Sequence, residues 1–155
     1  MRSRPRTVFL AAVASLSSSL PPLAGAEGPP ALGDRLRSIA AALRDGDAPS
    51  LHSAFVTEGK VRLQIAGLTE GQVSYGPGQV RTIFDKIFEG HRTRSFRFDE
   101  EDVSVTTPGT AFARGLWQRQ SRTTGALSRQ VLTFTLRLDE RSWRILEIRS
   151  SRPQP

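Results

Sequence analysis

The chain of 155 residues contains no cysteine. Disulfide bonds, thiol catalysis and the attachment of a lipid to a cysteine are therefore excluded. Without disulfides, the hydrophobic core has to hold the fold together unaided. Lysine is also scarce, because only Lys60 and Lys86 occur among 22 basic residues. We interpret this excess of arginine as the composition of a protein from a GC-rich genome.

Long apolar runs are absent except at the start of the chain. Three arginines within the first six residues precede an apolar stretch at 8–20, and Ala24-Gly25-Ala26 has the A-x-A pattern of a cleavage site. The stretch is shorter than the ~20 residues that span a bilayer, so a membrane anchor is disfavoured. The sequence predicts a signal peptide at residues 1–26. We expect an exported protein, periplasmic or secreted, that has no membrane contact after cleavage.

The net charge does not favour nucleic-acid binding. Cleavage would remove three arginines and no acid, which lowers the formal charge from +7 to +4. The remaining arginines are spread among acids, whereas nucleic-acid binding needs a basic face with interleaved aromatic residues. The length of the mature chain predicts one domain at residues 27–150. Residues 151–155 are predicted to be a disordered tail.

Helical periodicity is clearest at residues 79–89. One apolar stripe recurs there at the spacing of a helix face: Val80, Ile83, Phe84, Ile87 and Phe88. Pro77 suits the first turn of this helix and Gly90 suits its exit. A helix this short needs a sheet to lie on. Similar spacing predicts a helix at 34–44, followed by a short helix that Asp47 caps. We expect His52, in the short helix, to be exposed.

Alternating apolar residues predict the sheet. The expected strands are residues 61–65, 73–75, 94–98, 111–120, 131–138 and 143–148. The acidic run at 99–102 fits either a β-bulge or a bend in a long strand. A metal site would need further ligands and a turn glycine, so we interpret this run as solvated.

The strand at 111–120 has two unlike faces. One carries Ala111, Ala113, Gly115 and Trp117, and the other carries Phe112, Arg114, Leu116 and Gln118. If the second face lines the interior, Arg114 is a partly buried cation that needs an acid or an anionic ligand. If the first face lines it, Trp117 is the wall of a pocket for an apolar or aromatic ligand. The sequence leaves both possibilities open.

Several positions between 32 and 150 carry a resemblance to a known family. They are Val61-Arg62-Leu63-Gln64-Ile65, Tyr75, Gln79, Ile83-Phe84, Ile87-Phe88, Ser95-Phe96, Gly115 and Ile145-Leu146-Glu147-Ile148-Arg149. The chain resembles the nuclear transport factor two-like superfamily, which includes ketosteroid isomerase and SnoaL-like proteins. Within it, the chain is similar to the exported bacterial proteins of the DUF4783 family, whose function is uncharacterised. The resemblance implies an α+β fold, with N-terminal helices and a central helix packed on a curved antiparallel sheet, the cystatin-like cone.

Two hypotheses for function follow. The first is a non-enzymatic exported domain that binds a small apolar or anionic ligand, or a protein partner, as a homodimer formed through its sheet. Its candidate ligand-binding residues are Tyr75, Arg114 and Trp117. The alternative, implied by the superfamily, is a small isomerase or dehydratase in which Tyr75 acts with Asp99 or with His91, which we expect in a loop. A cone fully plugged by side chains is a third possibility.

No catalytic residue, metal ligand or cofactor is predicted from a motif. Neither His52 nor His91 has a partner at metal-ligand spacing. The G-x-S-x-G, P-loop and glycine-rich dinucleotide patterns are all missing from the sequence. Hydrolase and nucleotide-dependent functions are therefore not supported.

Overall fold

The computed structural model of the protein describes residues 31–107 and 109–154, so the predicted signal peptide at 1–26 lies outside the described residues. The helices are α1 (Leu32–Asp45), α2 (Ala48–Ser53) and α3 (Pro77–Gly90), with a 3₁₀ turn, η1 (Glu100–Asp102). The strands are β1 (Val61–Gln64), β2 (Val73–Tyr75), β3 (His91–Phe98), β4 (Ser104–Thr107), β5 (Thr110–Ser121), β6 (Leu127–Asp139) and β7 (Ser142–Ser151).

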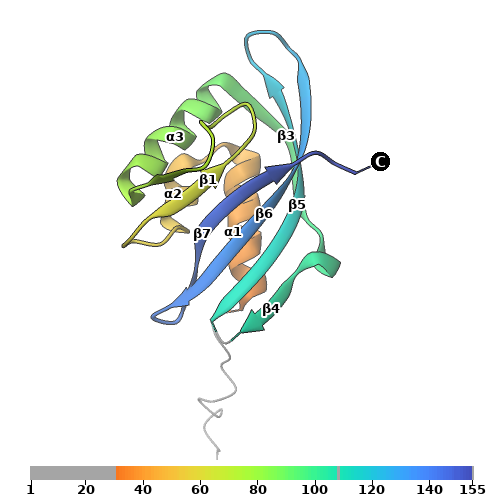
Figure 1. The fold of residues 1–155 in the computed structure, drawn as a ribbon. Helices are drawn as coiled ribbons and strands as arrows, with labels where there is room; N and C mark the ends of the chain where they lie inside the picture. Colours follow the sequence, from red (N-terminus) through yellow and green to blue (C-terminus); the bar gives the residue numbers. More distant parts are fainter. Residues whose placement is uncertain (1–30, 108, 155) are drawn as a thin grey trace, which may run out of the picture.

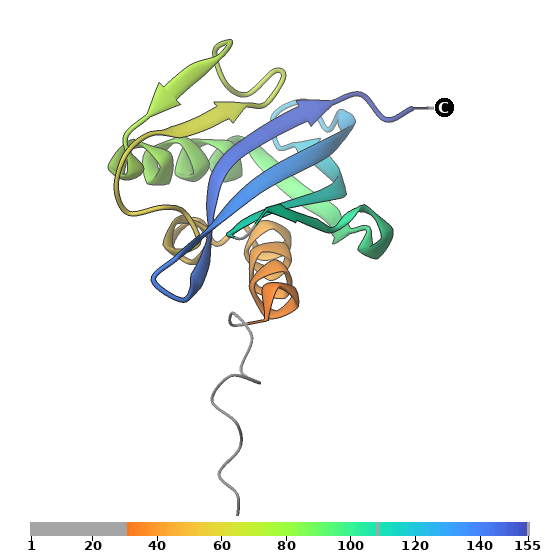
Figure 2. The same ribbon diagram turned by 60° about the horizontal axis from the view of Figure 1, so that its bottom comes forward.

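The seven strands form one sheet in the order β2-β1-β7-β6-β5-β3, with β4 paired to β5. Figures 1 and 2 show a curved sheet with the three helices on one side. We call that side the inner face and the opposite side the outer face. Long hairpins join β5 to β6 and β6 to β7, as the alternating patterns require. The predicted α+β class, helices packed on a curved sheet, is confirmed.

One strand pair departs from the prediction of an antiparallel sheet. β1 runs parallel to β7, with Arg62 opposite Glu147, whereas every other pair of described strands is antiparallel. A parallel pair needs a long crossover connection, and almost the whole domain lies between these two strands. Because no hairpin joins them, nothing in the local sequence indicated their relative direction.

The apolar stripe of α3 packs into the core as predicted. Val80, Phe84, Ile87 and Phe88 are buried, and Ile83 is half-buried against them. The ring of Phe84 lies 5.9 Å, between centroids, from both Phe55 and Phe88. The aromatic contacts therefore pack α3 against Phe55, which follows α2.

The two faces of β5 are now assigned. Ala111, Ala113, Gly115 and Trp117 point to the inner face, and Arg114 points outward. Gly115 is needed where β3 approaches, because a Cβ atom there would lie 2.7 Å from the Arg97 carbonyl oxygen and 2.7 Å from Phe96 Cζ. A contact that short requires the neighbouring backbone to move.

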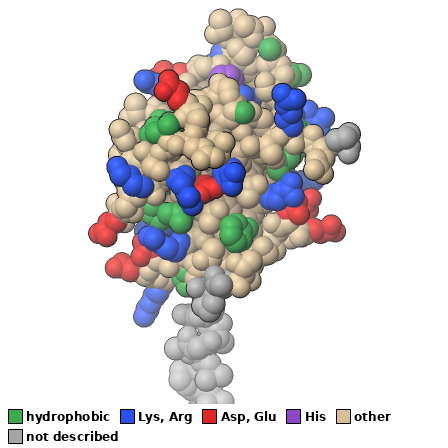
Figure 3. All heavy atoms as spheres, viewed as in Figure 1, with side chains coloured by type: hydrophobic (Ala, Val, Ile, Leu, Met, Phe, Trp, Pro, Cys, Tyr) green, Lys and Arg blue, Asp and Glu red, His purple; other side chains and the backbone are tan. Residues whose placement is uncertain are grey.

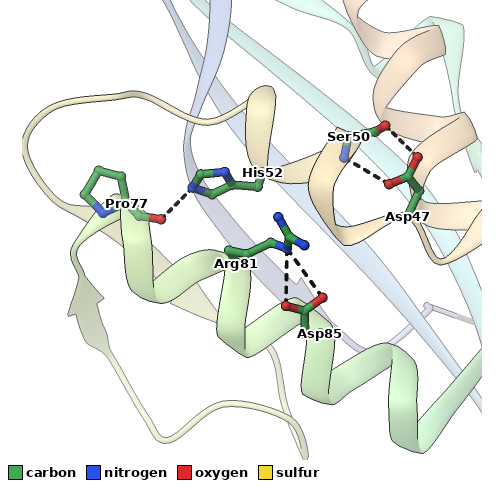
Figure 4. A network of polar contacts seen from close by, with 6 residues as sticks. All are labelled: Asp47, Ser50, His52, Pro77, Arg81 and Asp85. Carbon is green, nitrogen blue, oxygen red and sulfur yellow. Dashed lines mark hydrogen bonds and ion pairs between the residues drawn. The ribbon is translucent and has the colours of Figure 1, made fainter.

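Polar contacts seat α3 against α2 (Figure 4). His52 Nε2 lies 2.9 Å from the Pro77 carbonyl oxygen. The prediction that His52 is exposed is therefore wrong, because the side chain is half-buried against α3. Asp47 caps α2 by accepting a hydrogen bond from the Ser50 backbone N–H at 3.0 Å. Hydrogen bonds from the Ser50 hydroxyl and backbone lower the pKa of Asp47, and the charge of Arg81 adds to this.

The start of β3 is also a correction. The strand begins at His91, directly after α3, and not at residue 94, so His91 is a paired strand residue and not a loop residue. His91 is opposite Ser121, and the Arg122 N–H donates to the Gly90 carbonyl at 2.9 Å. This long-range pairing extends the strand to the helix end. The acidic run forms η1, a short exposed turn between β3 and β4.

Candidate functional site

The three predicted ligand-binding residues lie in different parts of the fold. Tyr75 is in the edge strand β2, opposite Val61, and packs partly against the core. Arg114 is on the outer face, where its Nη1 lies 3.7 Å from Asp102 Oδ2. Trp117 is on the inner face and only 1% exposed. No single recess in the described residues contains all three.

The catalytic pairing of Tyr75 with His91 or Asp99 is not assembled. Tyr75 precedes α3 and His91 follows it, and a helix of 14 residues is about 21 Å long. Asp99 follows β3, which lies at the opposite edge of the sheet from β2, the strand of Tyr75. Proton transfer requires donor and acceptor within hydrogen-bond reach, so these residues do not form one acid–base site.

The middle of the interior is filled by aromatic side chains. The rings of Phe96, Phe98 and Phe134 contact one another edge to face, with centroids 4.9 to 6.0 Å apart. The Trp117 Nε1–H donates to Thr93 Oγ1 at 3.0 Å, which satisfies its only polar group. The interior beside Trp117 is therefore filled by side chains.

An apolar recess of about 590 Å³ lies between α1, β3 and η1. We call it the α1 recess. Its apolar walls are Leu32, Leu36 and Ala40 of α1, Phe96 and Phe98 of β3, and Val103 after η1. Helical spacing places the α1 residues on one side of that helix, and strand alternation places the two phenylalanines on the inner face of β3. The volume is within the range of small-molecule sites.

Charged side chains stand around this apolar recess. Arg37, Arg44, Arg97 and Glu100 also line it, and all four are exposed. Arg37 is paired with Asp34 one turn earlier in α1. Within the described ranges, neither Arg44 nor Arg97 has an acid within 4.0 Å. The recess thus combines an apolar floor with a rim that is positive on balance.

The other end of β5 carries Arg119, which the sequence analysis did not select. Arg119 follows Trp117 on the inner face and is 5% exposed. The alternation along β5 placed it on the same face as Trp117, and that signal could have identified it. Its burial depends on the loop between β1 and β2, because a Cβ atom at Gly67 would lie 3.8 Å from Arg119 Nη2.

Other classes of site find no support in the described part of the chain. It contains no group of three or more histidine, aspartate or glutamate side chains placed to hold a metal ion. None of the helices in residues 31–107 and 109–154 is both long and apolar enough to cross a membrane.

Solved structures share this architecture. A ketosteroid isomerase-like protein from Erwinia carotovora atroseptica matches with a TM-score of 0.65 and 18% identity, covering 83% of this chain and 98% of that chain. A putative dehydratase of the NTF2-like family from Streptomyces avermitilis has a TM-score of 0.59 and 24% identity, over 79% and 94% of the two chains. A DUF4783 family protein from Bacteroides uniformis has a TM-score of 0.61 and 15% identity, over 77% and 97%.

At these identities the similar structures establish the fold and not the activity. They confirm the predicted resemblance to the nuclear transport factor two-like superfamily, with DUF4783 proteins among its similar structures. No curated protein matches the chain. The model of the SnoaL-like domain family matches residues 34–155, from α1 to the end of the sequence. The chain therefore belongs to the SnoaL-like domain family.

Proposed function

We propose that the protein is a non-enzymatic binding domain that holds a small amphipathic acid in the α1 recess. The observation that carries this proposal is the combination of six apolar wall residues with a rim of three arginines and one glutamate. An apolar ligand body would remove the exposed surface of Phe98, Leu32 and Val103 from water. A terminal carboxylate would reach Arg44 or Arg97 at the rim.

A binding role fits the recess better than an isomerase or dehydratase role. A carboxylate that acts as a general acid or base near neutral pH is tuned by burial or by neighbouring charges. The one carboxylate that lines the α1 recess, Glu100, is exposed on η1. The enzymatic alternative depends on Tyr75. This residue ends β2, just before the start of α3, and does not line the α1 recess.

The proposal is tested with decanoate as a probe and decanol as its uncharged counterpart, by isothermal titration calorimetry. We expect decanoate to bind more tightly than decanol. Ala40→Leu, which extends a side chain into the recess, should abolish binding of both. Arg97→Gln should weaken decanoate by about two- to fivefold, as expected for an exposed charge, and leave decanol unchanged.

Arg92→Gln is the matched control, because Arg92 is an exposed arginine of the same strand that does not line the recess. It should bind decanoate as the wild type does. Failure of the wild type to bind either probe, or wild-type affinity in Ala40→Leu, would contradict the proposal.

We also propose that two copies associate through the outer face. Phe112, Leu116 and Val131 are half-buried there although no described helix covers them. Around them, Glu147 bridges Arg62 at 2.7 Å and Arg149 at 3.5 Å. Figure 3 looks onto this face and shows apolar patches interleaved with charged side chains. Light scattering after size exclusion should give a dimer, and Leu116→Glu should give a monomer; a monomeric wild type contradicts the proposal.

Export is the remaining part of the proposal. It rests on the basic, apolar and A-x-A segments of residues 1–26, which are outside the described residues. Expression of the full chain in a bacterium, followed by N-terminal sequencing of the periplasmic fraction, should yield a protein that begins at Glu27. Retention of the intact N-terminus in the cytoplasm would contradict this prediction.

A further inference from the structure

A second recess, of about 630 Å³, lies beside Arg119 near the end of β5 and is also lined by the last residues of β7. We call it the Arg119 recess, and its polar lining includes Arg119, Arg129, Arg152, Ser128, Gln130 and Ser150. We propose that this recess binds a small oxyanion, such as the phosphate group of a small molecule, through the guanidinium of Arg119.

Arg119 is a buried cation without a protein counter-charge. Its side chain is 5% exposed, and it has no carboxylate within 4.0 Å among the residues that the structure describes. Glu147, the other buried charged residue, has two arginine partners. A buried charge is normally paired, because the loss of hydration is otherwise uncompensated. An anionic ligand would supply the missing partner.

The protein holds the guanidinium in one orientation. Arg119 Nη1 donates to Gln130 Oε1, and Gln130 Nε2 donates in turn to the Ala66 carbonyl oxygen at 2.8 Å. The guanidinium carbon lies 5.0 Å from the centre of the Trp117 ring, a cation–π distance. These contacts fix the plane of the guanidinium before any ligand arrives, which reduces the entropy lost on binding.

The side of the guanidinium away from Gln130 is left without acceptors. Nε is buried and has no hydrogen-bond partner, and the hydrogen bond that the structure gives the guanidinium uses Nη1. Nε and Nη2 together form the edge of arginine that binds two oxygens of a carboxylate or phosphate. Burial lowers the pKa of Arg119 from its usual value, and a bound anion would oppose that shift.

The surroundings of Arg119 favour negative charge. Arg129 and Arg152 line the recess and no acidic side chain does. Ser150 Oγ accepts a hydrogen bond from the Ala66 N–H at 2.8 Å, which leaves its own hydrogen free to donate. Three cations and three serine hydroxyls suit a tetrahedral dianion better than a single carboxylate.

The test is calorimetric titration of the wild-type protein with inorganic phosphate, with acetate as a carboxylate and chloride at matched ionic strength as background. We expect saturable binding of phosphate above the chloride background. Arg119→Met should weaken phosphate binding roughly ten- to hundredfold, the loss expected for charge-assisted hydrogen bonds. Acetate binding that is as tight and equally sensitive to Arg119 would identify the natural oxyanion as a carboxylate.

Arg114→Met is the matched control. It removes an arginine from the same strand, on the outer face and beside Asp102, and should leave phosphate binding unchanged. Arg129→Gln, at an exposed position, should weaken binding a few-fold, and it tests the site if Arg119→Met does not fold. Arg119→Lys should bind phosphate more tightly than Arg119→Met and more weakly than the wild type. Its ammonium keeps the positive charge but lacks the planar pair of N–H donors of a guanidinium.

Three results would overturn the proposal. The first is a heat of phosphate titration equal to that of chloride, and the second is an equal loss of phosphate affinity in Arg114→Met and Arg119→Met. The third is wild-type phosphate affinity in folded Arg119→Met or, if that variant does not fold, in Arg129→Gln. Quenching of tryptophan fluorescence gives a second readout, since Trp117 lies against the guanidinium. The Ala40→Leu variant separates this inference from the proposed function. It blocks the α1 recess and should bind phosphate normally.

Discussion

The two ends of the interior place charge in opposite ways. At the α1 recess the walls are apolar and the arginines stand exposed at the rim. At the Arg119 recess one arginine is inside, fixed by Gln130 and Trp117, and further arginines stand outside. Both recesses adjoin the inner face of one sheet. Phe96 lines the α1 recess, and its cross-strand neighbour, the buried Trp117, lies two residues before Arg119.

This difference has an energetic consequence. A rim charge remains hydrated, so it adds little to affinity and mainly selects the charge of the ligand. A charge inside the protein has already lost part of its hydration, so a matching anion gains more from it. We therefore expect the α1 recess to discriminate by shape and apolar surface, and the Arg119 recess to discriminate by charge.

The largest expected effect is on the core beneath α3. Phe84→Ala should lower the free energy of unfolding by about 3–5 kcal/mol, because it leaves a cavity beside Phe55 and Phe88. Urea unfolding followed by circular dichroism measures this change. Lys86→Ala, on the exposed side of α3, should stay within about 0.5 kcal/mol of wild type. Equal stabilities of the two variants would show that the Phe84 side of α3 is not buried.

Substitution of Gly115 should affect the α1 recess and leave the Arg119 recess unchanged. Gly115→Ala should cost about 1–3 kcal/mol of stability, because its Cβ atom would press on the Arg97 carbonyl oxygen and on the Phe96 ring. Since Phe96 lines the α1 recess, decanoate should also bind more weakly, while phosphate binding stays unchanged. Gly78→Ala is the control, since its Cβ meets nothing within 4 Å. A loss of phosphate affinity in Gly115→Ala would mean that the two ends are coupled.

Arg119→Met should leave stability unchanged or raise it by up to about 1 kcal/mol in phosphate-free buffer. Removal of an unpaired buried cation recovers its desolvation cost, which outweighs the lost cation–π contact with Trp117. Thermal unfolding with and without phosphate measures this, and phosphate should raise the melting temperature of the wild type only. Strong destabilisation without ligand would indicate that Arg119 has a structural role.

The smallest expected effect concerns Asp47, which lines neither recess. The pKa of Asp47 is lowered in the folded protein, so its cap stabilises the fold above the unfolded value of about 4 and is lost as the pH falls through the folded value. Asp47→Ala should therefore be less stable than wild type at pH 7, and the difference should shrink below about pH 4. Thermal unfolding at several pH values tests this, with Asp45→Ala as the control. A difference that does not depend on pH would rule out the charged cap.

Much of the fold could be predicted because it follows from local patterns. The stripe of Val80, Phe84 and Ile87 in α3 and the alternation of Leu132, Phe134 and Leu136 in β6 each bury the face that the sequence indicated. Gly46 ends α1 in a left-handed conformation, close to the helix end predicted at residue 44. These features depend on neighbours within one or two turns of the chain.

The candidate sites were harder to predict. The sequence offered Tyr75, Arg114 and Trp117 as one set, and the sheet separates them into an edge, an outer face and the core. Arg119 carried the same alternation signal as Trp117. Nothing near it in the chain indicated that Gln130 and the loop at Gly67 would enclose it. Enclosure is a property of distant segments, so periodicity does not report it.

By itself the sequence determined an amphipathic helix that needs a sheet to lie on, and the alternating strands of the long hairpins, because helix and strand periods sort side chains by face. Only the tertiary structure decided the direction of β1 beside β7, the inward face of β5 and the burial of Arg119. These depend on contacts between residues far apart in the chain. The free energy of such contacts comes from the surfaces that meet, and a local pattern does not contain that information.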